Sequence, residues 1–199
     1  MIAYQTHINT ARITRIAFLL AFIWVLVAVS ATANAETWNT SRPHYFGQWS
    51  SLLMTLGSSD VARADTSIGG DMLTVNFTKG KCESPKIMVL AKAPKYFGKN
   101  YNSWFGAYFR VDSGPIYKGI VFASGETGEN TYYLQVTFAQ GTKQELISSM
   151  EHGQTLRIKL TKKDVNTVYL HFSLSGSSES ISRAQQLCKN LKSDSQYSH

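Results

Sequence analysis

The sequence lacks the patterns from which most catalytic and metal centres are built. It has only two cysteines, Cys82 and Cys188, and neither has a second cysteine or a histidine at zinc-ligand spacing. There is no Gly-x-Ser-x-Gly elbow and no His-Glu-x-x-His motif. Asp60, Asp65 and Asp71 are spaced too irregularly for a calcium loop. The sequence therefore predicts a protein that is not an enzyme and that holds no cofactor or metal.

Acidic residues are missing from the first 35 positions, and no long apolar run follows residue 29. The start of the chain has Arg12 and Arg15, an apolar run over 16–29, and an Ala33-Asn34-Ala35 ending. This pattern is typical of a secretory signal peptide with an A-x-A cleavage site. We therefore predict that residues 1–35 are removed and that the protein works in the periplasm, or is secreted. The alternative is an uncleaved membrane anchor, for which the apolar run is short.

The two cysteines also allow a prediction about covalent cross-linking. An even pair in an exported chain favours a Cys82–Cys188 disulfide, and the alternative is two buried free thiols. The bridge would close a loop of more than 100 residues. In the chain-entropy model such a loop contributes up to about 4–5 kcal/mol.

The rest of the chain is long enough for one domain with a real core. We expect an N-terminal arm at 36–48, a single β-rich domain at 49–191 and a polar tail at 192–199. Loss of Arg12 and Arg15 with the signal peptide lowers the net charge from +7 to +5.

Alternation of apolar and polar residues predicts about seven or eight short strands. A short helix is expected over 143–150, and a C-terminal helix is expected to begin at Ser177. Residues 61–70 are expected to be a weakly structured connection. The predicted fold is mainly β, an antiparallel sandwich or open barrel, with the C-terminal helix pinned by the disulfide.

The central strand of this fold is predicted over Trp104–Asp112. Alternate side chains on a strand point to opposite faces. Phe105, Ala107, Phe109 and Val111 would then face the core. The aromatic and charged positions would share the other face, and these are Trp104, Tyr108, Arg110 and Asp112.

Aromatic and basic residues gather around this strand. Seven aromatics fall between residues 96 and 109. Tyrosine and tryptophan bury a ring face while keeping a polar group in water, which suits binding surfaces. The candidate binding residues are Tyr96, Tyr101, Trp104, Tyr108, Arg110, Asp112, Lys95 and Lys99. The alternatives are ordinary core packing for the rings, a solvated or edge-guarding role for the lysines, and a weak surface ion pair for Arg110 with Asp112.

The ordered motifs also suggest a family. They are a Lys81-Cys82 pair, Arg110-Val111-Asp112 before Ser113-Gly114-Pro115, and a Phe172-Ser173-Leu174-Ser175-Gly176 run before a helix with Cys188. In these features the chain resembles the VasI-type exported accessory proteins of bacterial type VI secretion systems, and more loosely the IalB-like periplasmic proteins. The resemblance covers roughly 49–191. It implies a periplasmic β-rich fold with a cysteine pair and an accessory or binding role.

These observations predict a periplasmic accessory protein that engages another envelope or secretion protein, for example an acidic one, through an aromatic and basic face. One alternative is an immunity-type inhibitor that inserts a loop into an exported enzyme. Another alternative is a glycan-binding sandwich with exposed aromatic rings. Nucleic acid is not an expected partner, and neither is stable membrane insertion after cleavage.

Overall fold

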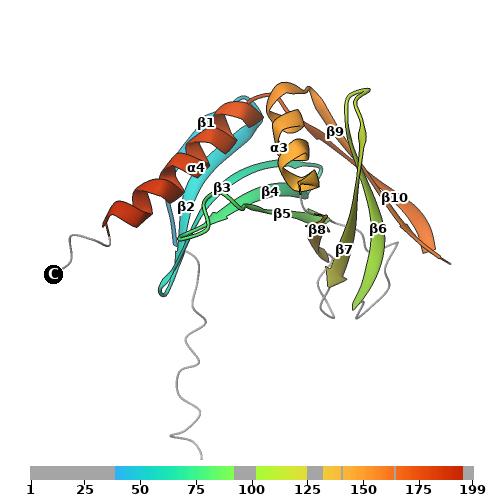
Figure 1. Ribbon diagram of the computed structural model, residues 1–199, viewed down its shortest axis with the longest axis horizontal. Coiled ribbons are helices and arrows are strands. Elements are labelled where there is room, and N and C mark those ends of the chain that lie inside the picture. Colours follow the sequence, from blue (N-terminus) through green and yellow to red (C-terminus); the bar gives the residue numbers. More distant parts are fainter. Residues whose placement is uncertain (1–38, 92–101, 125–131, 140, 164, 195–199) are drawn as a thin grey trace, which may run out of the picture. The chain divides into compact units, whose positions relative to one another are not determined.

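The computed structural model describes residues 39–91, 102–124, 132–139, 141–163 and 165–194 (Figure 1). These ranges contain ten strands and two helices. The strands are β1 (Asn39–Phe46), β2 (Trp49–Leu56), β3 (Ser59–Ile68), β4 (Asp71–Thr78), β5 (Lys86–Ala91), β6 (Asn102–Val111), β7 (Ile116–Ser124), β8 (Tyr132–Phe138), β9 (Thr155–Lys162) and β10 (Val165–Ser173), and the helices are α3 (Thr142–His152) and α4 (Ser177–Asp194). The predicted mainly β fold with two helices is confirmed, with more strands than the seven or eight expected.

All ten strands belong to one antiparallel sheet, in the order β1-β2-β3-β4-β5-β8-β7-β6-β9-β10. Neighbours in sequence pair throughout, except where β5 joins β8 and where β6 joins β9. These two non-local pairings join the hairpins into a single open sheet. The β9–β10 hairpin predicted from the alternation at 155–174 is confirmed.

Two segments that were expected to lie outside the sheet are strands. Residues 61–68, expected to be a weakly structured connection, belong to β3, which pairs with both β2 and β4. The inward side chains of β3 are Ala62, Ala64 and Thr66, which are buried but too small or polar to give a clear hydrophobic alternation. The described part of the expected arm, 39–46, is the edge strand β1, whose residues are almost all exposed.

One face of the sheet, called here the inner face, carries the hydrophobic core. Phe105, Ala107, Phe109 and Val111 are buried on this face, as the alternation of β6 predicts. Side chains opposite one another on paired strands share a face, so the register extends the inner face across all ten strands. The short helix α3 adds Leu146, Ile147 and Met150 to the same core. The opposite face is called the outer face.

Helix α4 covers the inner face of β2 and β3 (Figure 1). It buries Ile181, Ala184, Leu187 and Cys188 along one stripe, as the helical spacing predicts. The predicted Cys82–Cys188 disulfide is present and ties this helix to the turn that follows β4. The bridge is compatible with an exported protein in an oxidising compartment.

The β1–β2 turn lies directly against the junction of β10 and α4. A Cβ atom at Gly176, where φ is +91°, would come within 1.8 Å of the Phe46 carbonyl oxygen, so this contact requires glycine. The Trp49 indole N–H donates to the Ser173 carbonyl at 2.8 Å. These contacts anchor the C-terminal end of β10 to the opposite end of the sheet.

Candidate binding surface

The outer face of β6, β7, β9 and β10 carries aromatic and basic side chains in cross-strand rows. One row, in strand order β7-β6-β9-β10, is Lys118, Tyr108, Lys159 and Tyr169. The adjacent row is Ile116, Arg110, Arg157 and His171. We define the basic–aromatic face as these eight residues together with Trp104 of β6.

The rings of this face are open to solvent. Exposed fractions are 63% for Tyr169, 58% for Trp104 and 37% for Tyr108, and Ile116 beside them is 55% exposed. The Trp104 ring is supported by Phe122 at a centroid distance of 4.9 Å. The Lys159 ammonium lies 6.0 Å from the centroid of the Tyr169 ring, at the limit of a cation–π contact. The surface therefore presents several large exposed side chains side by side, which is unusual for a face without a partner.

Arg110 and Arg157 stand directly opposite each other on β6 and β9. Like charges in this position destabilise a sheet. Arg110 donates from Nε to the Gly114 carbonyl and from Nη2 to the Ser113 carbonyl, both at 3.0 Å. Arg157 donates from Nη1 to the Asp112 carbonyl at 2.8 Å. Neutral carbonyls of one turn thus hold both guanidinium groups, and both positive charges remain on the surface.

Asp112 does not join this cluster, although the strand pattern placed it beside Arg110. Strand β6 ends one residue earlier, and Asp112 adopts a left-handed φ of +47°. Its carboxylate oxygens accept from the backbone N–H groups of Gln154 and Thr155, each at 2.9 Å. The Asp112 carboxylate therefore fastens the turn to the start of β9. The ion pairs formed among described residues, Lys79–Asp60 and Lys189–Glu83, involve no residue of the basic–aromatic face.

A shallow recess of about 260 Å³ lies in the middle of this face. It is lined by Tyr108, Arg110, Ile116, Arg157, Ile158, Lys159, Tyr169 and His171. Guanidinium groups present paired N–H donors that match a carboxylate or phosphate, and an ammonium adds a flexible point charge. Tyrosine rings on two sides can pack against the apolar body that carries such an anion. The recess can therefore hold an anionic group together with part of its carrier.

The structure tests the positions of only some predicted site residues. Trp104, Tyr108 and Arg110 lie together on the exposed outer face, where the alternation of β6 placed them. Tyr96, Tyr101, Lys95 and Lys99 lie outside the described residues, so their roles stay predictions. The residues of β7, β9 and β10 on this face were not among the candidate binding residues predicted from the sequence. Their outward alternation was visible in the sequence, but the pairing of β9 with β6 was not.

The outer face of β2, β3 and β4 has a different character. Its polar side chains, of which Thr74 and Asn76 are buried and the others half-buried, bond to one another in what we call the buried polar network: Ser50, Arg63, Asp65, Thr74 and Asn76. Arg63 Nε donates to Asn76 Oδ1 at 2.8 Å, Asn76 Nδ2 donates to Thr74 Oγ1 at 3.0 Å, and the Ser50 hydroxyl bonds to the Asp65 carboxylate. Burial raises the pKa of Asp65, against the lowering effects of the Ser50 hydrogen bond and the Arg63 charge. Burial also lowers the pKa of Arg63.

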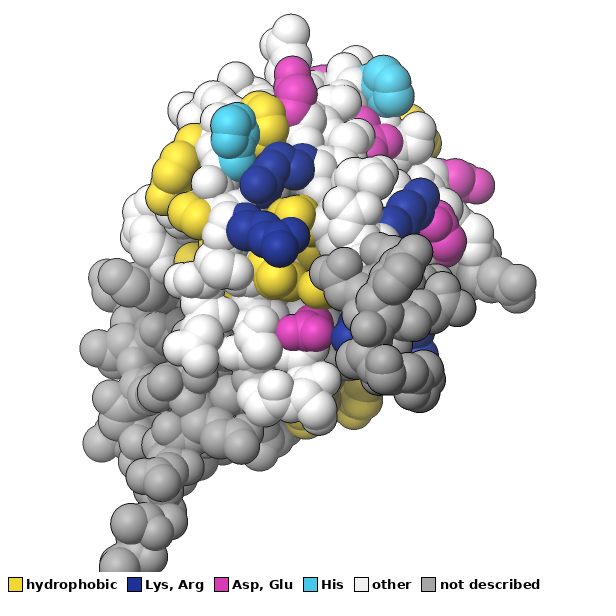
Figure 2. Space-filling model, turned by 90° about the vertical axis from the view of Figure 1, so that its left-hand side faces the viewer, with side chains coloured by type: hydrophobic (Ala, Val, Ile, Leu, Met, Phe, Trp, Pro, Cys, Tyr) yellow, Lys and Arg dark blue, Asp and Glu magenta, His cyan; other side chains and the backbone are white. Residues whose placement is uncertain are grey.

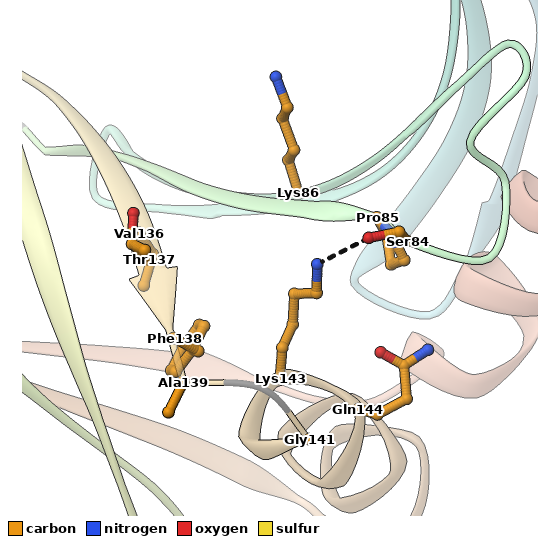
Figure 3. Close-up of a pocket in the computed structure, with 10 residues that line it drawn as sticks. All are labelled: Ser84, Pro85, Lys86, Val136, Thr137, Phe138, Ala139, Gly141, Lys143 and Gln144. Carbon is orange, nitrogen blue, oxygen red and sulfur yellow. Dashed lines mark hydrogen bonds between the residues drawn. The ribbon is translucent and has the colours of Figure 1, made fainter.

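A third region is a cavity of about 340 Å³ where β5 and β8 separate beside the start of α3 (Figure 3). The β5–β8 ladder spans only Met88 to Ala91 on β5, which leaves a gap at the other end of that strand. Lys143 reaches across the gap and its Nζ donates to the Ser84 hydroxyl at 3.2 Å, whereas Lys86 points away on the far side of β5 (Figure 3). The two ammonium groups do not converge, so this cavity is a weaker candidate than the basic–aromatic face.

Charge is distributed differently over the side of the protein on which α4 and β1 lie. Basic and acidic side chains are interspersed there (Figure 2). Within the described ranges, no group of three or more His, Cys, Asp or Glu side chains could hold a metal ion. Neither of the helices that the structure describes is long and apolar enough to cross a membrane.

No protein family, curated protein or solved structure matches this chain. The resemblance to VasI-type and IalB-like proteins therefore stays a prediction. The functional argument rests on the geometry and charge of the surface itself.

Proposed function

We propose that this chain is a non-enzymatic binding protein of the periplasm, exported by a cleaved signal peptide, that engages an acidic envelope or secretion protein through the basic–aromatic face. The Cys82–Cys188 disulfide supports an oxidising compartment. The observation that carries the proposal is the pair of cross-strand rows. They bring two lysines, two arginines, one histidine and two tyrosines onto one exposed surface.

Such a surface favours an acidic partner for two reasons. Uncompensated positive charge accelerates the encounter with a negative surface, and the acceleration falls as salt screens the charges. Exposed Tyr, Trp and Arg side chains are the residue types that most often dominate binding energy at protein interfaces. The arginines are already oriented by the carbonyls of the 112–114 turn, which lowers the entropy lost on binding.

The test compares three versions of residues 36–199 as bait in periplasmic extract. They are the wild type, a Lys159→Ser/Tyr169→Ser variant of the face, and a Lys81→Ser/Tyr45→Ser control that removes the same residue types elsewhere. Tyr45 is 76% exposed on β1, and Lys81 is exposed in the turn after β4. Each captured protein is then purified, and its dissociation constant is measured against the three versions.

We expect one or more acidic envelope proteins to bind the wild type and the control equally, and the face variant at least about tenfold more weakly. Raising the salt concentration should weaken the binding. Equal losses in the face variant and the control would contradict the proposal. Capture of a single exported enzyme, with stoichiometric loss of its activity, would identify an inhibitor acting through the same face.

The recess between the tyrosines supports glycan binding as a second candidate. Its volume of about 260 Å³ suits a carboxylated sugar ring seated between Tyr108 and Tyr169. Binding of a glucuronate-containing oligosaccharide, lost in the face variant but kept in the control, would favour this function if no protein partner is captured.

A further inference from the structure

The two edges of the sheet are built differently. Strand β1 is one edge, and it contains Pro43, which has no N–H group to donate. It also has a register shift between Ser41 and His44 and a left-handed φ of +53° at Arg42. Proline, bulges and irregular backbone are the usual means of preventing another strand from adding to an edge. The β1 edge is therefore blocked.

Strand β10 is the other edge, and it has a register shift only near its start, between Val165 and Val168, with regular pairing after it. It pairs regularly with β9 over six consecutive residues, Val168 to Ser173, and contains no proline and no lysine. Within the part of the chain that the structure describes, no strand pairs with its other side. Val168, Leu170 and Phe172 are buried on the inner face, while Tyr169 and His171 belong to the exposed basic–aromatic face.

The direction of the β10 backbone groups follows from the register. The N–H of Leu174 donates to the Gln154 carbonyl at 2.8 Å. Because backbone direction alternates along a strand, Phe172, Leu170 and Val168 also direct their N–H and C=O groups toward β9. The backbone groups of Tyr169, His171 and Ser173 then point away from the sheet. The Ser173 carbonyl agrees with this assignment, since it accepts from the Trp49 indole outside the ladder. Among the residues that the structure describes, none bonds to the N–H and C=O groups of Tyr169 and His171, so these groups can pair with a further strand.

We propose that β10 binds an extended acidic segment of the partner as an added antiparallel strand. This proposal rests on the proposed function and specifies how the partner's backbone would dock. In an antiparallel pair, the residue opposite Tyr169 or His171 has its own backbone groups toward β10 and its side chain on the same face. Acidic side chains at these positions would extend the two rows beside Lys159, Tyr169, Arg157 and His171. Main-chain bonds would supply affinity and the rows would select for acidic residues.

A second copy of this chain fits the edge less well. Two β10 strands paired across a twofold axis would place His171 and Tyr169 of one copy beside the same basic rows of the other. The basic rows of the two copies would then continue one another across one face, and this concentration of positive charge disfavours the pairing. Charge complementarity therefore selects an acidic segment as the occupant.

The test uses an acetylated and amidated heptapeptide of alternating glutamate and threonine, titrated into residues 36–199 at low salt and followed by backbone NMR. Two methylated versions separate strand addition from charge attraction alone. In the antiparallel pairing, the amides of glutamate face β10 and those of threonine face solvent. N-methylation of the two central glutamates should weaken binding by about tenfold or more, since two backbone bonds are lost and the methyl groups clash. N-methylation of two threonines should change it by less than about twofold.

A second readout is the hydrogen exchange of the Tyr169 and His171 amides, which should slow when the unmodified peptide binds, because each N–H gains an acceptor. Equal effects of the two methylation patterns, or no binding of the peptide, would overturn strand addition. The proposed function would still stand if the captured partner distinguished the Lys159→Ser/Tyr169→Ser variant from its control. Concentration-dependent dimerisation of the free chain through β10 would also overturn the acidic-segment assignment.

Discussion

The outer face of the sheet contains two regions with similar residues and opposite organisation. In the buried polar network, Arg63 lies opposite Asn76, to which its Nε donates a hydrogen bond, and its charge interacts with that of Asp65. On the basic–aromatic face, Arg110 lies opposite Arg157, and within the described part of the chain the two guanidinium groups bond to backbone carbonyls alone. The first arrangement bonds polar side chains to one another. The second keeps like charges together on the surface at some cost in stability.

This difference indicates which region of the outer face is suited to binding a partner. A polar network whose donors and acceptors are paired stabilises the fold but offers little to a ligand. A row of exposed rings and uncompensated cations contributes little to folding but matches an acidic surface. Substitutions in the two regions should therefore have opposite effects on stability and on binding.

The disulfide gives the largest expected effect on stability. It closes the chain across a separation of 106 residues and holds α4 over the half of the sheet that contains the buried polar network. A Cys82→Ser/Cys188→Ser variant should lose about 3–4 kcal/mol of unfolding free energy. Urea denaturation measures the loss. At a temperature where the variant remains folded, its affinity for the partner should match that of the wild type. A loss of affinity alongside the loss of stability would show that binding depends on the half of the sheet that the disulfide stabilises.

Arginine substitutions compare the two regions directly. Arg63→Ala leaves Asn76 and Asp65 without their cation and should cost about 2 kcal/mol of stability, with little change in binding. Arg157→Ala should change stability by no more than about 0.5 kcal/mol and should weaken binding. Urea denaturation and partner titration of both variants provide the measurement. Equal stability losses would contradict the distinction.

The pH dependence of stability gives a smaller, signed effect. Because burial raises the pKa of Asp65 above its ordinary value of 3.8, the folded state holds the proton to higher pH than the unfolded state does. The destabilisation by Asp65 ionisation is absent below pH 3.8, grows between pH 3.8 and the higher folded pKa, and is constant above it. Asp65→Asn removes this ionisation, so its stability relative to the wild type should rise over that pH window. Urea denaturation at several pH values measures this, and a pH-independent difference would show that Asp65 is not penalised by burial.

The smallest expected effect is on the stability of the face variant itself. Lys159→Ser/Tyr169→Ser removes only exposed side chains and should shift the free energy of unfolding by less than about 1 kcal/mol. Thermal denaturation beside the Lys81→Ser/Tyr45→Ser control makes the comparison. A shift several times larger than that of the control would mean that Lys159 and Tyr169 support the fold.

The sequence predicted the elements of this fold better than their arrangement. Strong alternation identified β6, β9 and β10, and helical spacing with two cysteines identified α4 and its bridge. Strand β3 was missed because Ala62 and Ala64 bury little apolar surface. The exposure of Trp104 and Tyr108 followed from local alternation. The cross-strand rows of the basic–aromatic face could not be predicted in this way. The β6–β9 pairing joins segments about fifty residues apart, and no local pattern specifies such a partner.

Asp112 shows a second limit of the pattern. Its position two residues after Arg110 predicts a shared face only if the strand continues. The strand ends at Val111, and the backbone reverses into a turn in which the Asp112 carboxylate binds two amides. A local conformational change therefore redirected one predicted site residue, while Arg110 remained in place.

Hydroxyl-radical footprinting of the complex with the captured partner tests the central claim most directly. Four exposed aromatic side chains act as internal reporters: Trp104, Tyr108 and Tyr169 on the basic–aromatic face, and Tyr45 on β1. We predict that oxidation of the three face residues falls on binding while that of Tyr45 is unchanged. Protection of Tyr45 with unchanged oxidation of Trp104, Tyr108 and Tyr169 would contradict the assignment of the basic–aromatic face as the binding surface.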